Sequence, residues 1–240
     1  MRKWLFLFLV AYQLNAFADA AGKVLFTSKD VLAERNNQQR NLSRGSPFFE
    51  GDTIITRAGA LAQLQYSNGT LVSLQPNSSY KVVSYNKSAK SENSAYLGRG
   101  GLDSTTNEKK KSQLSTPLVA LAISGTQYRT GIFCNTEKCK KIAVQVTQGK
   151  VIIDNKYPLG PGELQSSAIY NAITKQITYG PIDWAANGWV SFPSNLTNGS
   201  DFIDPSTLTS VINSTTINNA ANAIVNSIAA PTTTICLCCQ

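Results

Sequence analysis

Residues 60–74 read ALAQLQYSNGTLVSL, and this stretch decides the fold class. Its first half carries apolar side chains at every second position, namely Ala60, Ala62, Leu64 and Tyr66. That two-residue period predicts a β-strand. Asn68-Gly69 follows at once, which is the strongest short-range signal for a hairpin turn, and an apolar run returns at 71–74. The stretch therefore predicts a hairpin, in which a two-residue turn would place Tyr66 opposite Leu71.

The same pattern extends outward on both sides, from about residue 23 to residue 165. Short apolar runs alternate with Gly, Asn, Pro and Ser, as in a chain of strands and turns. At 142–146 the apolar residues share one face, Gln148-Gly149 is expected to turn the chain, and Val151 begins the returning strand. Residues 169–179 are expected to add one or two strands. The sequence predicts an all-β fold of short strands.

The C-terminal part changes in character. Residues 181–199 are rich in Pro, Gly and Asn, and we expect Trp184 and Trp189 to cap an open end of the β core. Asp204-Pro205 supplies a helix N-cap and a first-turn proline, and apolar residues then recur on one face. We predict a C-terminal helix over residues 204–230.

The N-terminus has the three parts of a secretory signal. Arg2 and Lys3 are followed by an apolar run at 4–12 and by the small-x-small site Ala16-Phe17-Ala18. Nine apolar residues are too few to cross a hydrocarbon core, which needs about 20. Cleavage after Ala18, or alternatively after Ala20, predicts a periplasmic or secreted protein without stable membrane insertion.

The amino-acid composition excludes several classes of active site and metal site. The 240 residues include 22 Lys and Arg, 14 Asp and Glu, and no histidine. Catalytic triads, Cys-His pairs and His-rich metal sites are therefore excluded. The net charge is +8, and its only dense cluster is Lys109-Lys110-Lys111, in a stretch expected to be a loop over residues 104–112; Lys138, Lys140 and Lys141 form a second small group. The chain lacks the Arg-aromatic interleaving of nucleic-acid binders. We expect no enzyme activity, cofactor, metal or nucleic-acid partner.

Several motifs together resemble the FecR domain of bacterial envelope proteins, over roughly residues 45–163. In order, they are EGDTIIT (50–56), NGT (68–70), LQPNS (74–78), GGL (100–102), STPLVA (115–120), SGTQY (124–128), VQVTQGKV (144–151) and LGPGE (159–163). Each motif is weak alone, and their shared order and spacing carry the resemblance. The resemblance implies short stacked strands, in an irregular β-solenoid-like arrangement or a flattened sandwich.

The motif residues are expected to have structural roles. They are Gly51, Asp52, Asn68, Gly69, Pro117, Gly125, Thr126 and Gly149. The four glycines suit sharp turns or positive φ, Asp52 should bond backbone amides in its own turn, and Pro117 should fix an extended approach to a strand. Ser124 stands where the family often has Arg, so any pairing of that Arg with a buried acid would be lost here.

Five cysteines in an exported chain invite disulfides. Cys134 and Cys139 flank a loop of hairpin length, and we predict that they are bonded to each other. Cys236, Cys238 and Cys239 lie in a terminal tail at 231–240. Those three could hold a soft metal, crosslink to a partner or cover a groove.

These observations divide the chain into a signal peptide (1–18), a FecR-like β domain (22–167), a loop-rich extension (168–203), the helical segment and the cysteine tail. The best-known relatives also have a cytoplasmic anti-sigma segment and a transmembrane helix, which we do not expect beside a cleaved signal. We predict a non-catalytic envelope module that binds a protein or a glycan. The alternatives are an accessory sensor in cell-surface signalling and a histidine-free cell-wall hydrolase.

Overall fold

The computed structural model describes residues 19–85, 93–106, 111–132, 140–162 and 165–192. The predicted signal peptide, the Cys134–Cys139 disulfide, the 204–230 helix and the cysteine tail lie outside these residues. Within the described part of the chain, no helix is long and apolar enough to span a membrane.

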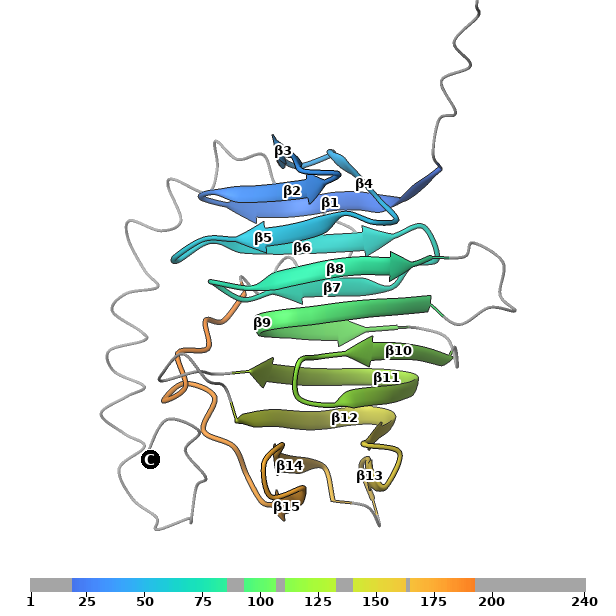
Figure 1. The fold of residues 1–240 in the computed structure, drawn as a ribbon, viewed down its shortest axis with the longest axis vertical. Coiled ribbons are helices and arrows are strands. Elements are labelled where there is room, and N and C mark those ends of the chain that lie inside the picture. Colours follow the sequence, from blue (N-terminus) through green and yellow to red (C-terminus); the bar gives the residue numbers. More distant parts are fainter. Residues whose placement is uncertain (1–18, 86–92, 107–110, 133–139, 163–164, 193–240) are drawn as a thin grey trace, which may run out of the picture.

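The described residues form one continuous sheet of 15 strands, folded into two layers that face each other (Figure 1). The predicted all-β fold of short, stacked strands is confirmed. The first layer runs in the order β3 (Gln38–Asn41), β2 (Val31–Arg35), β5 (Thr53–Thr56), β8 (Ser79–Ser84), the start of β9 (Asn93–Thr105), β10 (Lys111–Ser115), the start of β11 (Ala120–Ile132), the end of β12 (Lys141–Ile153) and β13 (Tyr157–Leu159). The second layer runs in the order β4 (Pro47–Phe49), β1 (Ala20–Ser28), β6 (Leu61–Tyr66), β7 (Leu71–Leu74), the end of β9, the end of β11, the start of β12, β14 (Ser167–Asn171) and β15 (Gln176–Tyr179).

Three 13-residue strands, β9, β11 and β12, pass from one layer to the other. The first part of β9 pairs with β8 and β10, whereas its last part pairs with β7 and β11. Likewise β12 pairs with β14 at its start and with β13 at its end. The two layers are therefore joined through shared strands as well as through their packed inner faces.

Glycines make the crossing of β11 and β12 possible. Gly125 and Gly149 have φ values of 56° and 76°, and the strand register shifts beside them. A Cβ on Gly149 would lie 2.0 Å from the Gly125 carbonyl oxygen, so no larger residue fits. The predicted turn at Gln148-Gly149 is wrong, because a positive-φ glycine also permits a bulge in a strand that continues.

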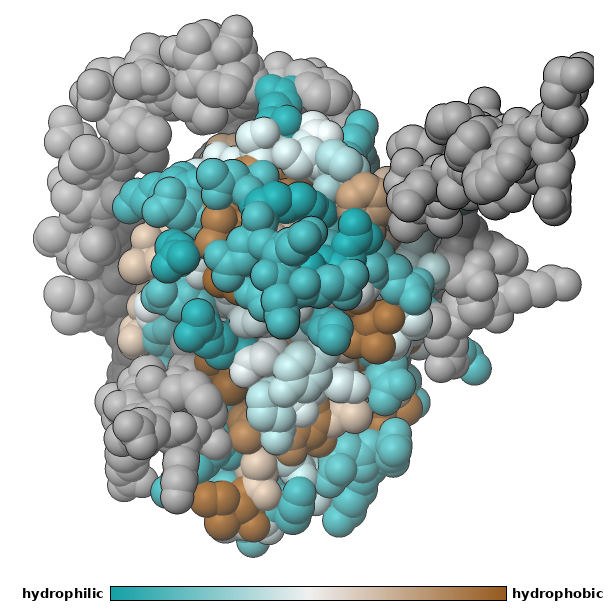
Figure 2. Space-filling view, turned by 45° about the horizontal axis from the view of Figure 1, so that its top comes forward, coloured by the Kyte–Doolittle hydropathy of each residue, from teal (hydrophilic) through white to brown (hydrophobic). Residues whose placement is uncertain are grey.

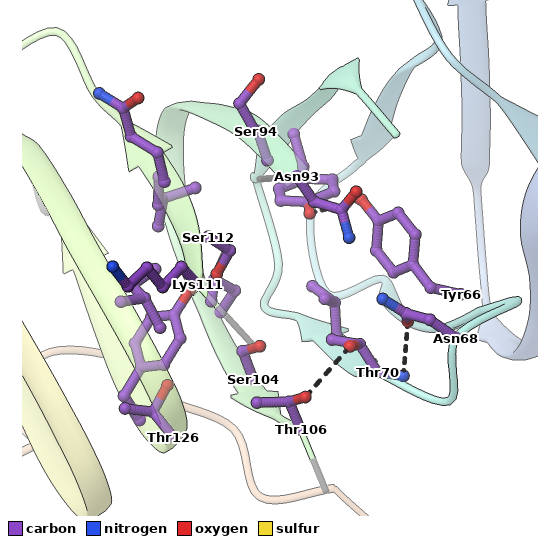
Figure 3. A pocket seen from close by; sticks show the side chains of 18 residues that line it. Tyr66, Asn68, Thr70, Asn93, Ser94, Ser104, Thr106, Lys111, Ser112 and Thr126 are labelled. Atoms are coloured by element: carbon purple, nitrogen blue, oxygen red, sulfur yellow. Dashed lines mark hydrogen bonds between the residues drawn. The ribbon is translucent and has the colours of Figure 1, made fainter. Parts of the chain in front are cut away.

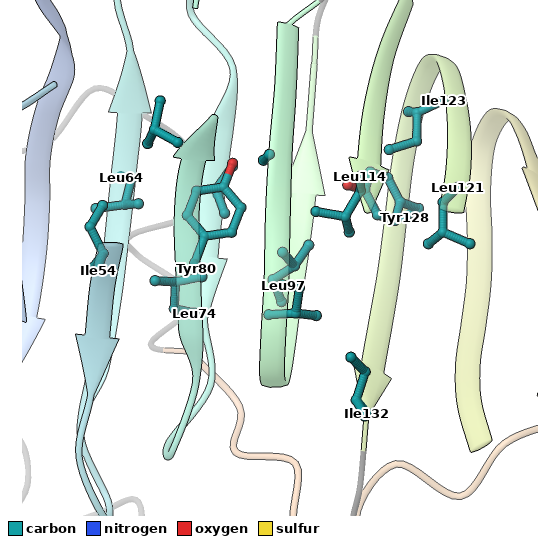
Figure 4. Close-up of a cluster of buried hydrophobic side chains, with 14 of the residues drawn as sticks. Ile54, Leu64, Leu74, Tyr80, Leu97, Leu114, Leu121, Ile123, Tyr128 and Ile132 are labelled. Atoms are coloured by element: carbon teal, nitrogen blue, oxygen red, sulfur yellow. The ribbon is translucent and has the colours of Figure 1, made fainter. Parts of the chain in front are cut away.

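The core fills the space between the two layers (Figure 4). Its fully buried members come from both layers and include Ile54, Leu64, Leu74, Leu97, Leu114, Leu121 and Ile132. Tyr66 on β6 and Tyr80 on β8 join their hydroxyl groups at 2.7 Å, which links the layers by a buried hydrogen bond. Alternating strands thus send one set of side chains inward and leave the other set for the outer faces.

The β6–β7 hairpin has a three-residue loop. Gln65 pairs with Leu71, and the Tyr66 N–H donates to the Thr70 carbonyl at 2.9 Å. Tyr66 therefore does not lie opposite Leu71 as predicted. Gly69 takes φ 86°, and the Asn68 side chain accepts the Thr70 N–H at 3.0 Å, which is the geometry of a bulged three-residue hairpin.

Asp52 is fully buried in the turn before β5. Its carboxylate accepts the Phe49 N–H at 2.9 Å and pairs with Arg40 and, at 3.5 Å, with Arg35 Nε. Gly51 beside it has φ 85°. The buried acid thus finds its cations on β2 and β3, so Ser124 does not leave it without an arginine.

Two local expectations are wrong. Pro117 lies in the turn between β10 and β11, where the Thr116 hydroxyl accepts the Val119 N–H at 3.0 Å, instead of leading an extended segment into a strand. The expected loop at 104–112 is shorter, since Ser104 and Thr105 belong to β9 and Lys111 begins β10. Polar side chains on a sandwich strand that faces solvent resemble a loop in sequence.

Candidate binding groove

A row of polar side chains crosses the outer face of the second layer. Strand register aligns one residue from each of five neighbouring strands, namely Gln63, Ser73, Asp103, Arg129 and Gln145. Their neighbours along each strand, such as Leu64 and Val144, point into the core. We call these five aligned residues the polar row.

Hydrogen bonds run along the polar row. Gln63 Nε2 donates to the Ser73 hydroxyl at 3.2 Å, and Arg129 Nε donates to Asp103 Oδ1 at 2.7 Å. Burial raises the pKa of Asp103, while its interactions with Arg129 and Trp189 lower it, and the net direction is upward. The Arg129 and Asp103 charges offset each other, so the polar row as a whole is neutral.

A second row lies beside the polar row and consists of small residues. Gly101, Gly131 and Ala143 are aligned by the same register. Residues 183–192 cross this row, and we call them the tryptophan wall. Trp189 lies so close to Gly101 that a Cβ there would be 2.5 Å from its ring, and Trp184 packs in one cluster with Ala143. The two tryptophans therefore cover an outer face and do not cap an open end of the core as predicted.

Specific contacts fix the tryptophan wall to the second layer. The Gln75 amide donates to the Val190 carbonyl at 2.9 Å and accepts the Val190 N–H at 2.8 Å. Trp184 Nε1 donates to Gln145 Oε1 at 2.6 Å. The Arg129 guanidinium lies 4.7 Å from the centre of the Trp189 ring, within the range of a cation–π contact. The wall is thus attached to the polar row itself.

The tryptophan wall and the polar row border a groove of about 490 Å³. Its remaining lining includes Leu71, Thr105, Gln127, Thr147, Ser191 and Phe192. The volume falls within the roughly 300–1,000 Å³ of small-molecule sites. Gln63 is only 3% exposed, and its Oε1 has no hydrogen-bond partner among the described residues. Such a buried acceptor is costly unless something donates to it.

A second hollow opens between the two layers (Figure 3). Tyr66 and Thr126 line it, and Asn68, Asn93 and Lys111 stand around it. Its volume is about 60 Å³, room for a few water molecules at about 10–15 Å³ each. The Thr126 hydroxyl has no partner among the described residues, so water would satisfy it. We therefore regard this hollow as a hydrated gap and the outer groove as the candidate site.

Figure 2 shows one face of the molecule, on which most residues are hydrophilic and the hydrophobic ones lie in small separate patches. The chemistry of the groove itself follows from its lining residues. The described part of the groove lining contains a single carboxylate, Asp103, which Arg129 holds. The paired carboxylates of glycosidases would require a second. Within the described residues there is also no group of three His, Cys, Asp or Glu that could hold a metal.

The motif residues predicted from the sequence do not line the groove. Gly51 and Asp52 shape the turn before β5, while Asn68 and Thr126 border the hollow between the layers. The residues of the polar row were not singled out, because their alignment depends on pairing between strands far apart in sequence. The alternation at 60–66 marks Gln63 as facing away from Leu64, and this is the only local signal that the sequence offers.

Comparison with known proteins identifies a family match in the central region of the chain. The FecR protein family matches residues 52–152. Two crystal structures of a candidate anti-sigma factor from Parabacteroides distasonis ATCC 8503, at 1.65 and 2.50 Å resolution, are each 18% identical with a TM-score of 0.44. Each match covers 53% of this chain and 58% of the other, so this chain spans less than two thirds of those proteins. No curated protein matches. The family match at residues 52–152 confirms the resemblance to the FecR domain that the motifs predict.

Proposed function

We propose that this chain is a non-catalytic, exported module of the bacterial envelope, periplasmic or secreted, that binds an envelope protein or glycan in the groove of its second layer. The FecR family is regulatory and associated with the envelope, which supports a module of this kind. The observation that carries the proposal is the groove itself, in which the neutral polar row lies beside an aromatic wall.

Binding, not catalysis, suits the chemistry of the groove. Its only described acid and base are engaged with each other at 2.7 Å, and its other polar groups are amides and hydroxyls that donate and accept hydrogen bonds. Such groups orient a ligand without moving protons. A sensing role in cell-surface signalling is the second candidate, favoured by the regulatory character of the family.

Photo-crosslinking tests the proposal. A benzoylphenylalanine is placed at Gln127, which lines the groove, and in a matched control at Tyr96, which is 37% exposed on β9 in the first layer. We expect adducts in envelope fractions from the Gln127 variant alone. Equal adducts from both positions, or none from Gln127, would contradict the proposal. An outer-membrane receptor or transducer in the adduct would select the sensing role.

A further inference from the structure

The polar row has a repeat that matches one class of ligand. Neighbouring strands of a sheet lie about 4.7–4.9 Å apart, so the five residues of the polar row follow one another at that interval across β6, β7, β9, β11 and β12. The sugars of an extended β-linked polysaccharide repeat at nearly the same interval. Successive residues of an extended peptide instead advance by only about 3.2–3.4 Å. A glycan chain can therefore place one sugar over each strand of the polar row, whereas an extended peptide cannot place one residue over each.

The net charge of the groove restricts the class of ligand further. Asp103 and Arg129 offset each other, and the other three members of the polar row are amides and a hydroxyl. The exposed side of the groove adds Gln127 and Thr147, which are also uncharged. A groove without net charge gains nothing from an acidic polymer, since desolvating that polymer's charges would be uncompensated. The fitting ligand is neutral and rich in hydroxyl groups.

The groove also offers the two kinds of contact that a sugar uses. Gln127 and Thr147 are exposed and line the groove, so their amide and hydroxyl groups can exchange hydrogen bonds with sugar hydroxyls. Trp189 and Phe192 stand on the wall side of the groove. Aromatic rings supply rigid apolar surface against which the C–H groups of a sugar ring pack.

We propose that the groove binds a neutral, β-linked polysaccharide chain, which lies across the strands along the polar row and beside the tryptophan wall. This inference rests on the proposed function, because it names the class of ligand for the same groove. One sugar would lie over each strand of the polar row, and Gln63 would mark one end of the bound chain.

Calorimetric titration of the full chain after signal cleavage tests this inference. The probes are chito-oligosaccharides and cello-oligosaccharides of two to six sugars, which are β-linked, and malto-oligosaccharides of the same lengths, which are α-linked. We expect affinity for the β-linked probes to rise with length and to level off at about five sugars, one per strand of the polar row. Equal binding of the α-linked probes, or affinity independent of length, would overturn the inference.

Substitutions inside and outside the groove test where the oligosaccharide binds. Thr147→Arg fills the groove, and Val83→Arg adds the same side chain on β8 of the first layer, where Val83 is 46% exposed. We expect at least a tenfold loss of oligosaccharide affinity for Thr147→Arg and no change for Val83→Arg. Unchanged affinity in Thr147→Arg would overturn the inference.

The two proposals can fail separately. If crosslinks from Gln127 capture an envelope protein while none of the oligosaccharides binds, the glycan inference is overturned and the proposed function stands. If the groove neither crosslinks nor binds oligosaccharide, both are overturned.

Discussion

The two outer faces of the sandwich are built by the same strand alternation, yet they differ in what they offer a ligand. On the first layer, Val83 and Tyr96 stand 46% and 37% exposed on β8 and β9. On the second layer, Gln63 is almost completely buried, and the polar row lies beside the tryptophan wall. The difference shows that alternation alone makes a surface, whereas a covering segment turns that surface into a groove.

The covering segment also changes the energetics of the polar groups. Hydrogen bonds and ion pairs strengthen where solvent is partly excluded, and unpaired polar groups there become costly. Arg129 contacts both Asp103 and Trp189, so one side chain ties the polar row to the wall. The second layer thereby holds its polar groups in fixed positions, which would lower the entropic cost of binding the proposed ligand.

The largest effect is expected from Gly149→Val, which should destroy both faces at once. Gly149 has φ 76°, and any Cβ would lie 2.0 Å from the Gly125 carbonyl oxygen where β12 crosses between layers. We expect a loss of at least about 3 kcal/mol in the free energy of unfolding, measured by urea denaturation. Gly69→Ala is the control, because its φ of 86° is similar but no atom lies within 4 Å of the added Cβ. An equal loss in both variants would show that the loss of stability comes from backbone strain at positive φ, and not from the close contact where β12 crosses between the layers.

Removal of the Trp184 side chain should reduce stability far more than removal of a side chain from the outer face of the first layer. Trp184 is 8% exposed and packs on Ala143 and Ile169, so Trp184→Ala should cost about 3 kcal/mol. Tyr96→Ala on the first layer should change stability by less than about 0.5 kcal/mol. Denaturant unfolding of both variants measures the difference. A similar, small cost for both would mean that the wall does not pack on the second layer.

A smaller effect is expected from Gln75→Ala, which should loosen the wall without disturbing the layers. The substitution removes two hydrogen bonds to Val190, and we expect a loss of about 1–3 kcal/mol. The fluorescence of Trp184 and Trp189 should shift toward that of solvated tryptophan. Gln113→Ala, on an exposed position of β10, is the control. An unchanged spectrum for Gln75→Ala would contradict the anchoring role.

The smallest effect is a decline in stability at alkaline pH that should not distinguish the faces. Burial raises the pKa of Tyr66, Tyr80 and Tyr128, which lie between the layers. Above the unfolded pKa of about 10, the unfolded chain loses protons that the folded chain keeps, so stability falls as pH rises. Three such groups should cost about 1 kcal/mol at pH 10 and more above it. Tyr128→Phe should reduce the decline, and an undiminished decline would assign it to other groups.

Short-range sequence signals predicted the strands well and their pairing poorly. The alternation at 60–66 and the apolar run at 71–74 predict the strands observed as β6 and β7, because strand period and turn chemistry are local properties. Gly149 was misread because a glycine with positive φ suits both a turn and a bulged strand. Only its packing against Gly125, 24 positions earlier, distinguishes the two.

The groove depends on still longer-range pairing. Ser73 faces Asp103, and Asp103 faces Arg129, through registers that no neighbouring residue specifies. The tryptophan wall attaches through Gln75 to Val190, across 115 positions. A sequence shows that these side chains are polar or aromatic, but the fold alone brings them to one face.

Hydrogen–deuterium exchange of the full chain, with and without chitohexaose, is the most direct test of whether the second layer is the functional face. We expect slower exchange in β6, β7, the end of β9 and residues 183–192, with no change in β5 and β8. Slower exchange confined to β5 and β8 would show that the ligand binds the first layer instead.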